Sequence, residues 1–186
     1  MFLYRQLRIT SQKLLNSALI LLLCACTPAL NWRDVRLESL DGSALKAALP
    51  CKPDSATRKQ QLGGIQVDLS MMGCVVNDAT FTLSRIPVLD PLSAPKLLEA
   101  WQAAAVANMK AVATPKILVT VSGAGTWPPA ARVTLTGAAT QAQMIWFAKQ
   151  SSSGLTLYQA AVYGNRPQSS VTNEAITTFF ESLQLQ

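Results

Sequence analysis

The sequence predicts an α+β fold in which an antiparallel sheet packs against two helices. Strand-like segments of alternating or β-branched apolar residues recur along the chain, separated by short turn signals. Two segments instead carry apolar residues at spacings of three and four, which is the pattern of a helix. They lie within residues 93–114 and 171–183. Several strands, a helix, four more strands and a closing helix are typical of helices packed on an antiparallel sheet.

Five strands are expected before the first helix, at residues 31–37, 45–49, 58–62, 65–71 and 79–87. Pro50 ends the second strand, because proline cannot continue a sheet ladder. The pair Gly63-Gly64 predicts a two-residue hairpin turn. Asn77-Asp78 predicts the turn into the fifth strand.

The first helix follows a proline-rich loop. Ser93 is expected to cap its N-terminus, and Pro95 is tolerated in its first turn. The helix should end before Pro115. Its apolar stripe is expected to consist of Leu98, Trp101, Ala105, Met109 and Val112.

The second half of the chain returns to strands. They are expected at residues 116–121, 132–136, 142–148 and 155–163. A closing helix is expected over residues 171–183, and its inner face should hold Ile176, Phe179, Phe180 and Leu183.

Residues 1–25 have the pattern of a secretion signal. Arg5, Arg8 and Lys13 form a positively charged segment. The apolar run at residues 14–23 suits a signal sequence and is too short to span a bilayer core of about 30 Å. An uncleaved membrane anchor is the alternative interpretation.

The segment Leu23-Cys24-Ala25-Cys26 resembles the bacterial lipobox. The resemblance implies cleavage after Ala25 and attachment of acyl chains, palmitate among them, to Cys26. Thr27 follows, and by resemblance to Gram-negative sorting rules this implies the outer membrane, with the domain facing the periplasm. The expected organisation is a signal peptide over residues 1–25, a lipidated tether over 26–30 and a single α+β domain over 31–186.

Three cysteines follow the predicted cleavage point, at positions 26, 51 and 74. Lipid occupies Cys26, which leaves an even pair in an oxidising compartment. A Cys51–Cys74 disulfide is therefore predicted. A thiol pair serving as a redox or metal site is the alternative, but the spacing is far from C-x-x-C and the chain has no histidine to complete a ligand set.

The domain resembles the PsbP/Mog1-like family. A strand enters proline at Ala48-Leu49-Pro50, a hairpin, a central helix and a strand meander follow, and the chain ends with Phe179-Phe180-Glu181-Ser182-Leu183. The ending is similar to the F-x-S-F ending of that family, with Leu183 in place of the second aromatic residue. The family combines adaptors, assembly factors and uncharacterised envelope proteins, so the resemblance implies a fold and no single function.

Composition restricts the chemistry. With no histidine, the chain cannot form a Ser-His-Asp or Cys-His site or a histidine-based metal site. No catalytic residue, metal site or cofactor is predicted. The net charge of +6 falls to about +3 without the signal, and its cations are dispersed, which does not suggest nucleic-acid binding.

The loop Trp127-Pro128-Pro129 is unusual because a tryptophan beside two prolines forms a stiff, amphipathic contact element. An indole folded back over the sheet is the alternative interpretation.

Three functions are compatible with these features. The first is a non-enzymatic envelope lipoprotein that binds another protein or supports an assembly. The second is a carrier of a small apolar ligand held between sheet and helix, lined by Trp101, Met109, Met144 and Phe180. The third is a carboxylate-based hydrolase, which would need two carboxylates with separated pKa values in one cleft.

Overall fold

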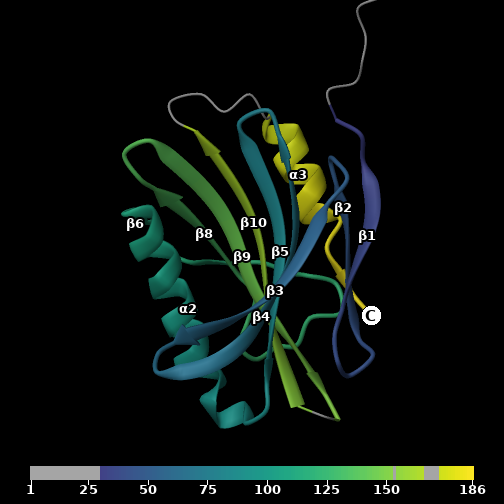
Figure 1. The fold of residues 1–186 in the computed structure, drawn as a ribbon, viewed down its shortest axis with the longest axis vertical. Helices are drawn as coiled ribbons and strands as arrows, with labels where there is room; N and C mark the ends of the chain where they lie inside the picture. Colours follow the sequence, from purple (N-terminus) through teal and green to yellow (C-terminus); the bar gives the residue numbers. More distant parts are fainter. Residues whose placement is uncertain (1–29, 153, 166–171) are drawn as a thin grey trace, which may run out of the picture.

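A computed structural model describes residues 30–152, 154–165 and 172–186. Two antiparallel sheets and two α-helices form the domain (Figure 1), which confirms the predicted α+β class. The small sheet has the order β1 (Arg33–Glu38), β2 (Ala44–Leu49) and β11 (Gln184–Leu185).

The large sheet follows the order β3-β4-β5-β10-β9-β8-β6, and β7 pairs separately with β8. Its strands are β3 (Asp54–Leu62), β4 (Ile65–Val76), β5 (Ala79–Val88), β6 (Val112–Ala113), β7 (Ile117–Leu118), β8 (Ala131–Thr136), β9 (Thr140–Ser151) and β10 (Gly154–Asn165). The helical segments are η1 (Pro91–Ser93), α2 (Ala94–Met109) and α3 (Asn173–Glu181).

The domain is layered around the large sheet. The small sheet and α3 lie on one side of it, and α2 lies on the other (Figure 1). The prediction of a single sheet was therefore incomplete. The last residues of the chain form β11, which pairs with β2, with Leu185 opposite Leu45. Two residues are too few to show a strand period, so this pairing had no sequence signal.

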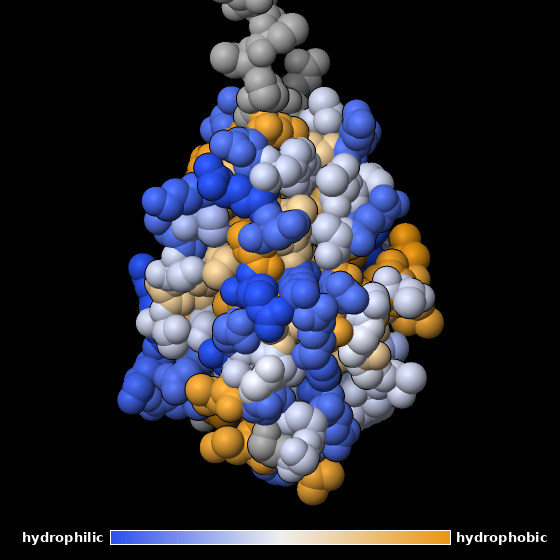
Figure 2. Space-filling model, turned by 90° about the vertical axis from the view of Figure 1, so that its right-hand side faces the viewer, coloured by the Kyte–Doolittle hydropathy of each residue, from blue (hydrophilic) through white to orange (hydrophobic). Residues whose placement is uncertain are grey.

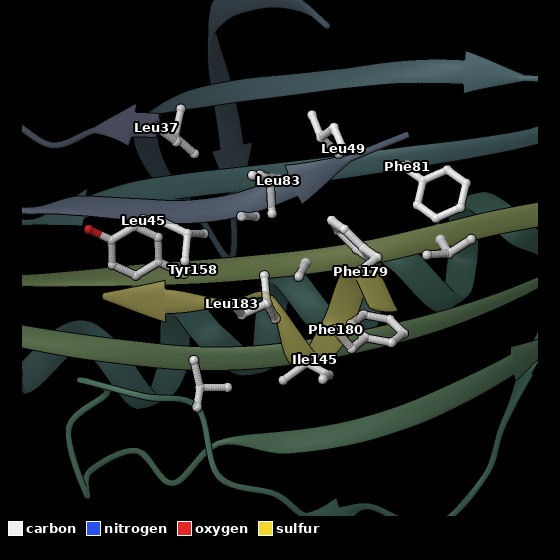
Figure 3. Packing of buried hydrophobic residues seen from close by; sticks show 14 of the residues in the cluster. Leu37, Leu45, Leu49, Phe81, Leu83, Ile145, Tyr158, Phe179, Phe180 and Leu183 are labelled. Carbon is white, nitrogen blue, oxygen red and sulfur yellow. The ribbon is translucent and has the colours of Figure 1, made fainter. Parts of the chain in front are cut away.

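The first core lies between the large sheet, the small sheet and α3 (Figure 3). The rings of Phe81 and Phe179 meet edge to face with their centroids 5.4 Å apart. Leu45 and Leu49 of β2 are completely buried against them in the same cluster. The alternation of β5 therefore sends Phe81 and Leu83 to this side, as strand periodicity requires.

The second core lies between the large sheet and α2. Trp146 and Met144 of β9 and Leu97 and Trp101 of α2 are all buried in it. Trp101 was predicted as a core residue, and the structure confirms this. Leu97 was missed, because the predicted stripe was displaced by one position toward Leu98, which is only partly buried.

The start of α2 differs from the prediction. Ser93 is its N-cap residue but forms no side-chain cap, because it ends the 3-10 turn η1 in a helical conformation. Its hydroxyl donates to the carbonyl oxygen of Asp90 at 2.7 Å. Asp90 is extended, and its carboxylate accepts from the amide of Leu92 at 3.1 Å, so Asp90 is the true side-chain cap of the helical segment.

The end of α2 also differs. Lys110 adopts a left-handed conformation with φ of 48° and ends the helix, so Val112 belongs to β6 and is exposed rather than part of the helical stripe. In the predicted strand 116–121, only Ile117 and Leu118 pair as a strand, and both are exposed at the sheet edge. Local β-propensity cannot distinguish such an edge from a buried strand.

The remaining predicted elements are confirmed with small shifts in their ends. Gly63 and Gly64 form the turn of the β3–β4 hairpin, both with positive φ, and Leu62 pairs with Ile65. Thr172 caps α3 by accepting from the amide of Ala175 at 3.2 Å. The predicted first residue of this helix, Val171, lies outside the described residues.

Candidate functional site: an open groove on the large sheet

The side of the large sheet that faces α2 is only partly covered. α2 packs over Val133, Leu135 and Trp146, and at the other end it reaches Leu62 at the β3–β4 turn. Beyond that turn, β3, β4 and β5 continue without a covering helix. Pair register places Met71 beside Ser84, Gly73 beside Thr82 and Val75 beside Thr80 on this same face.

The uncovered part forms a groove of about 680 Å³, named here the open groove. It is lined by Lys52, Asp54, Ser55, Ala56, Arg58, Gln60, Leu69, Met71, Met72, Gly73, Cys74, Val75, Thr80 and Thr82. Volumes of several hundred Å³ are typical of ligand-binding clefts.

The centre of the open groove is apolar and exposed. Met71 is 38% exposed and Val75 is 66% exposed, although both belong to β4, which has a paired strand on each side. Gly73 lies between them. A Cβ atom at Gly73 would come within 2.5 Å of the carbonyl oxygen of Phe81, so the close approach of β4 and β5 requires glycine here.

The polar side chains of the open groove come mainly from β3. Every second residue of this strand lines the groove, namely Asp54, Ala56, Arg58 and Gln60. Lys59 points to the opposite side of the sheet, where it lies across from Asp68 in the strand register. Arg58 lies opposite Leu69. Among the described residues, the structure shows no salt bridge to Arg58.

Tyr163 pairs with Thr80 at the inner margin of this surface. Burial raises the pKa of Tyr163, and a side-chain hydrogen bond with Thr82 partly offsets that effect. The phenol therefore stays neutral at physiological pH and adds no charge beside the open groove.

The predicted disulfide is present. The Cα atoms of Cys51 and Cys74 lie 5.9 Å apart, within the range for a disulfide bond. Cys51 follows β2 of the small sheet and Cys74 belongs to β4 of the large sheet, so the bond joins the two sheets beside the open groove.

Trp127, Pro128 and Pro129 lie away from the open groove, before β8 and toward the opposite edge of the large sheet. The Trp127–Pro128 peptide bond is cis, Pro128 is buried, and Trp127 is 50% exposed. A contact role for this loop stays a prediction. Cys26, the predicted lipid site, lies outside the described residues.

The ligand cavity predicted between Trp101, Met109, Met144 and Phe180 does not form. Phe180 belongs to the first core, whereas Trp101 and Met144 belong to the second core on the other side of the large sheet. Because the large sheet separates the two cores, one cavity cannot collect all of these side chains. A smaller groove of about 250 Å³ does lie between α2 and β8, lined by Ala103, Val106, Val133 and Leu135 among others.

A polar cluster lies where the β1–β2 turn meets the first core. The Asp41 carboxylate accepts from the amide and the hydroxyl of Ser43, at 3.0 and 2.6 Å. The Ser43 hydroxyl lies 3.4 Å from that of Tyr158. Burial by itself would raise the pKa of Asp41, but hydrogen bonds from Ser43, Ser151 and Ser39 outweigh it and hold the pKa well below its usual value. These bonds stabilise the β1–β2 turn.

The described ranges contain no cluster of histidine, cysteine or acidic side chains suited to a metal ion. Within the same ranges, every helix is too short or too polar to cross a membrane. Figure 2 shows the face formed by the small sheet, where hydrophilic side chains run down the middle and separate the hydrophobic patches.

No family model matches the chain, and no curated protein matches it. The resemblance to the PsbP/Mog1-like family therefore stays a prediction. Among solved structures, the chain is similar to LpqN, which is involved in cell envelope biogenesis of Mycobacterium tuberculosis. The two share 7% sequence identity with a TM-score of 0.48, and the match covers 84% of this chain and 92% of LpqN. Function therefore has to be inferred from the residues of this chain.

Proposed function

We propose that this chain is a lipid-anchored protein of the bacterial cell envelope that binds a segment of another protein and has no catalytic activity. The open groove carries the proposal. It exposes Met71 and Val75 between polar side chains, and exposed methionine is common on surfaces that accept peptide segments.

The chemistry of the open groove favours binding over hydrolysis. Asp54 is its one carboxylate among the described lining residues, whereas a carboxylate hydrolase needs an acid and a base in the same cleft. Membrane anchorage through lipid on Cys26 and a position on the outer membrane facing the periplasm complete the proposal. They rest on the lipobox resemblance and on Thr27.

Site-specific photo-crosslinking in a Gram-negative host tests this function. A photoreactive residue at Val75 of the full chain should crosslink to a discrete envelope protein. Ile117 supplies the matched control, since it is a β-branched residue with 64% exposure against 66% for Val75, but lies toward the other edge of the same sheet. Identical crosslinks at both positions, or none at Val75, would contradict the proposal.

A carrier function is the second candidate, and the apolar groove between α2 and β8 favours it. Its volume of about 250 Å³ is slightly below the usual range for small-molecule sites. Organic extracts of the purified full chain should then contain a bound apolar molecule. Ala103→Phe, which fills this groove from α2, should abolish the binding, and Ala107→Phe, one turn farther along α2 and outside the lining of the groove, should preserve it.

A further inference from the structure

The outer edge of β3 has no strand partner within the described part of the chain. Among these residues, β3 stands at the end of the large sheet and pairs only with β4, over all nine residues from Asp54 to Leu62. Eight of these nine residues are exposed. A long exposed edge strand presents unpaired backbone groups that can pair with another extended segment.

This edge is also the rim of the open groove. The side chains of Ala56, Arg58 and Gln60 point into the groove, so an added strand would continue its floor outward. Resting on the proposed protein-binding function, we propose that the partner supplies an extended segment, with an acidic residue beside Arg58 and an apolar residue beside Ala56, that pairs antiparallel with β3 and directs alternate side chains over the open groove. Strand addition of this kind combines backbone hydrogen bonds for affinity with alternate side chains for specificity.

The side chains of β3 define what the segment must contain. A residue beside Arg58 would meet a guanidinium without a salt bridge among the described residues, which favours glutamate or aspartate there. Two positions farther along the segment, a residue beside Ala56 would meet a small side chain next to exposed Met71, which favours a large apolar residue. The next alternate position faces Asp54 and favours a basic residue.

A second copy of this chain fits the edge poorly. When β3 pairs with itself antiparallel over its full length, Arg58 at its centre faces the same residue of the copy. Like charges directly opposite each other destabilise a strand pair. Charge complementarity therefore selects a different chain with acidic residues over self-association.

Peptide binding by the full chain in detergent provides the test. The probe is a fluorescent nonapeptide with glutamine, glutamate, leucine and lysine at alternate positions and threonine between them, matched to Gln60, Arg58, Ala56 and Asp54 in antiparallel order. Its affinity should fall about fivefold in Arg58→Glu, because the charge pair becomes repulsive. A peptide with lysine in place of the glutamate should gain affinity in the same variant.

Lys59→Glu is the matched control, because Lys59 is the adjacent cation on β3 but faces away from the open groove. Lys59→Glu should change the affinity for the peptide by less than about twofold, since on the face of β3 that holds Lys59 the peptide carries only threonine. Equal losses in Arg58→Glu and Lys59→Glu would overturn the inference. Arg58→Gln, with an intermediate loss, checks that the effect follows charge rather than folding.

A peptide N-methylated at alternate residues separates strand addition from simple occupation of the groove. It should not bind, because it lacks the amide donors that pair with β3. Undiminished binding of the N-methylated peptide would overturn strand addition. In that case, a Val75 crosslink to an envelope protein in cells would still support a groove-binding function. If no Val75 crosslink forms in cells, the proposed function itself is refuted. Sedimentation should show no dimer that depends on β3, and a dimer that the nonapeptide dissociates would assign the edge to a second copy and overturn the proposal.

Discussion

The bond between Cys51 and Cys74 is the one covalent cross-link between the two sheets among the described residues. It closes a loop with a sequence separation of 23, which restricts the unfolded chain. Cys74 is 93% buried, since only 7% of its surface is exposed, whereas Cys51 is partly exposed. The disulfide therefore restricts the conformations of the unfolded chain by closing the loop, and in the folded state it holds the end of β2 against β4.

Cys51→Ser should lower the free energy of unfolding by about 3 kcal/mol, the value expected from loop entropy. Cys74→Ser should cost more, because a buried serine hydroxyl also loses its hydration. Urea denaturation of the oxidised protein and both variants measures these changes, and reduction should weaken the wild type to the level of Cys51→Ser. A loss below about 1 kcal/mol in both variants would show that the bond contributes little.

Asp41 links pH to stability through the β1–β2 turn. Hydrogen bonds to its carboxylate lower the folded-state pKa, so the folded state prefers the charged form. The stabilisation is therefore fully present above the unfolded pKa of about 4 and is lost as the pH falls below it.

Asp41→Asn should lower the free energy of unfolding by about 1–2 kcal/mol at pH 7, because bonds to a charged acceptor are replaced by weaker neutral ones. The difference from the wild type should shrink below about pH 4, where the carboxylate of the unfolded state begins to protonate while that of the folded state stays charged. Urea denaturation between pH 2 and 7 measures this trend. Asp68→Asn on exposed β4 is the control, and a constant difference at every pH would contradict the mechanism.

At the scale of elements, the β3–β4 turn contacts α2 through glycine. A Cβ atom at Gly63 would lie 2.9 Å from the Cβ of Ala100 in α2, whereas one at Gly64 would meet nothing within 4 Å. Both glycines have positive φ. The pair therefore separates backbone strain, which both share, from a steric clash that only Gly63 has.

Gly64→Ala should cost about 1 kcal/mol through backbone strain alone. Gly63→Ala should cost about 2–3 kcal/mol, since the clash with Ala100 adds to the strain. Ala100→Gly should cost less in the Gly63→Ala background than in the wild type, because it relieves the clash, and thermal or urea denaturation measures all of these variants. Equal losses for the two glycines would show that the turn does not pack on α2.

Elements with a clear local period were predictable, and those made by context were not. The alternating strand around Phe81, the strand with a continuous apolar run around Trp146 and the helix containing Trp101 occur where their apolar patterns indicate. Ser93 failed as a side-chain cap because the preceding 3-10 turn had already placed it in a helical conformation. β11 and the exposed position of Ile117 depend on neighbouring strands that are distant in sequence.

At the scale of the whole molecule, the proposed function depends on delivery to the envelope. Cys26→Ser should leave a full-length precursor without incorporated palmitate, because lipid attachment requires the thiol and precedes cleavage. Cys24→Ser is the matched control and should be processed normally, since Leu23 disfavours cleavage before Cys24. Metabolic labelling and gel mobility measure both variants, and normal processing of Cys26→Ser would refute the lipoprotein assignment.

The sequence by itself determined the longer strands, both hairpin turns and the pairing of Cys51 with Cys74, because strand patterning, turn chemistry and cysteine count are local or countable properties. The tertiary structure alone decided that there are two sheets and that Phe180 and Trp101 lie in separate cores. It also created the open groove. A helix of 16 residues is only about 24 Å long and cannot cover one face of an eight-stranded sheet, so the part over β3, β4 and β5 stays open.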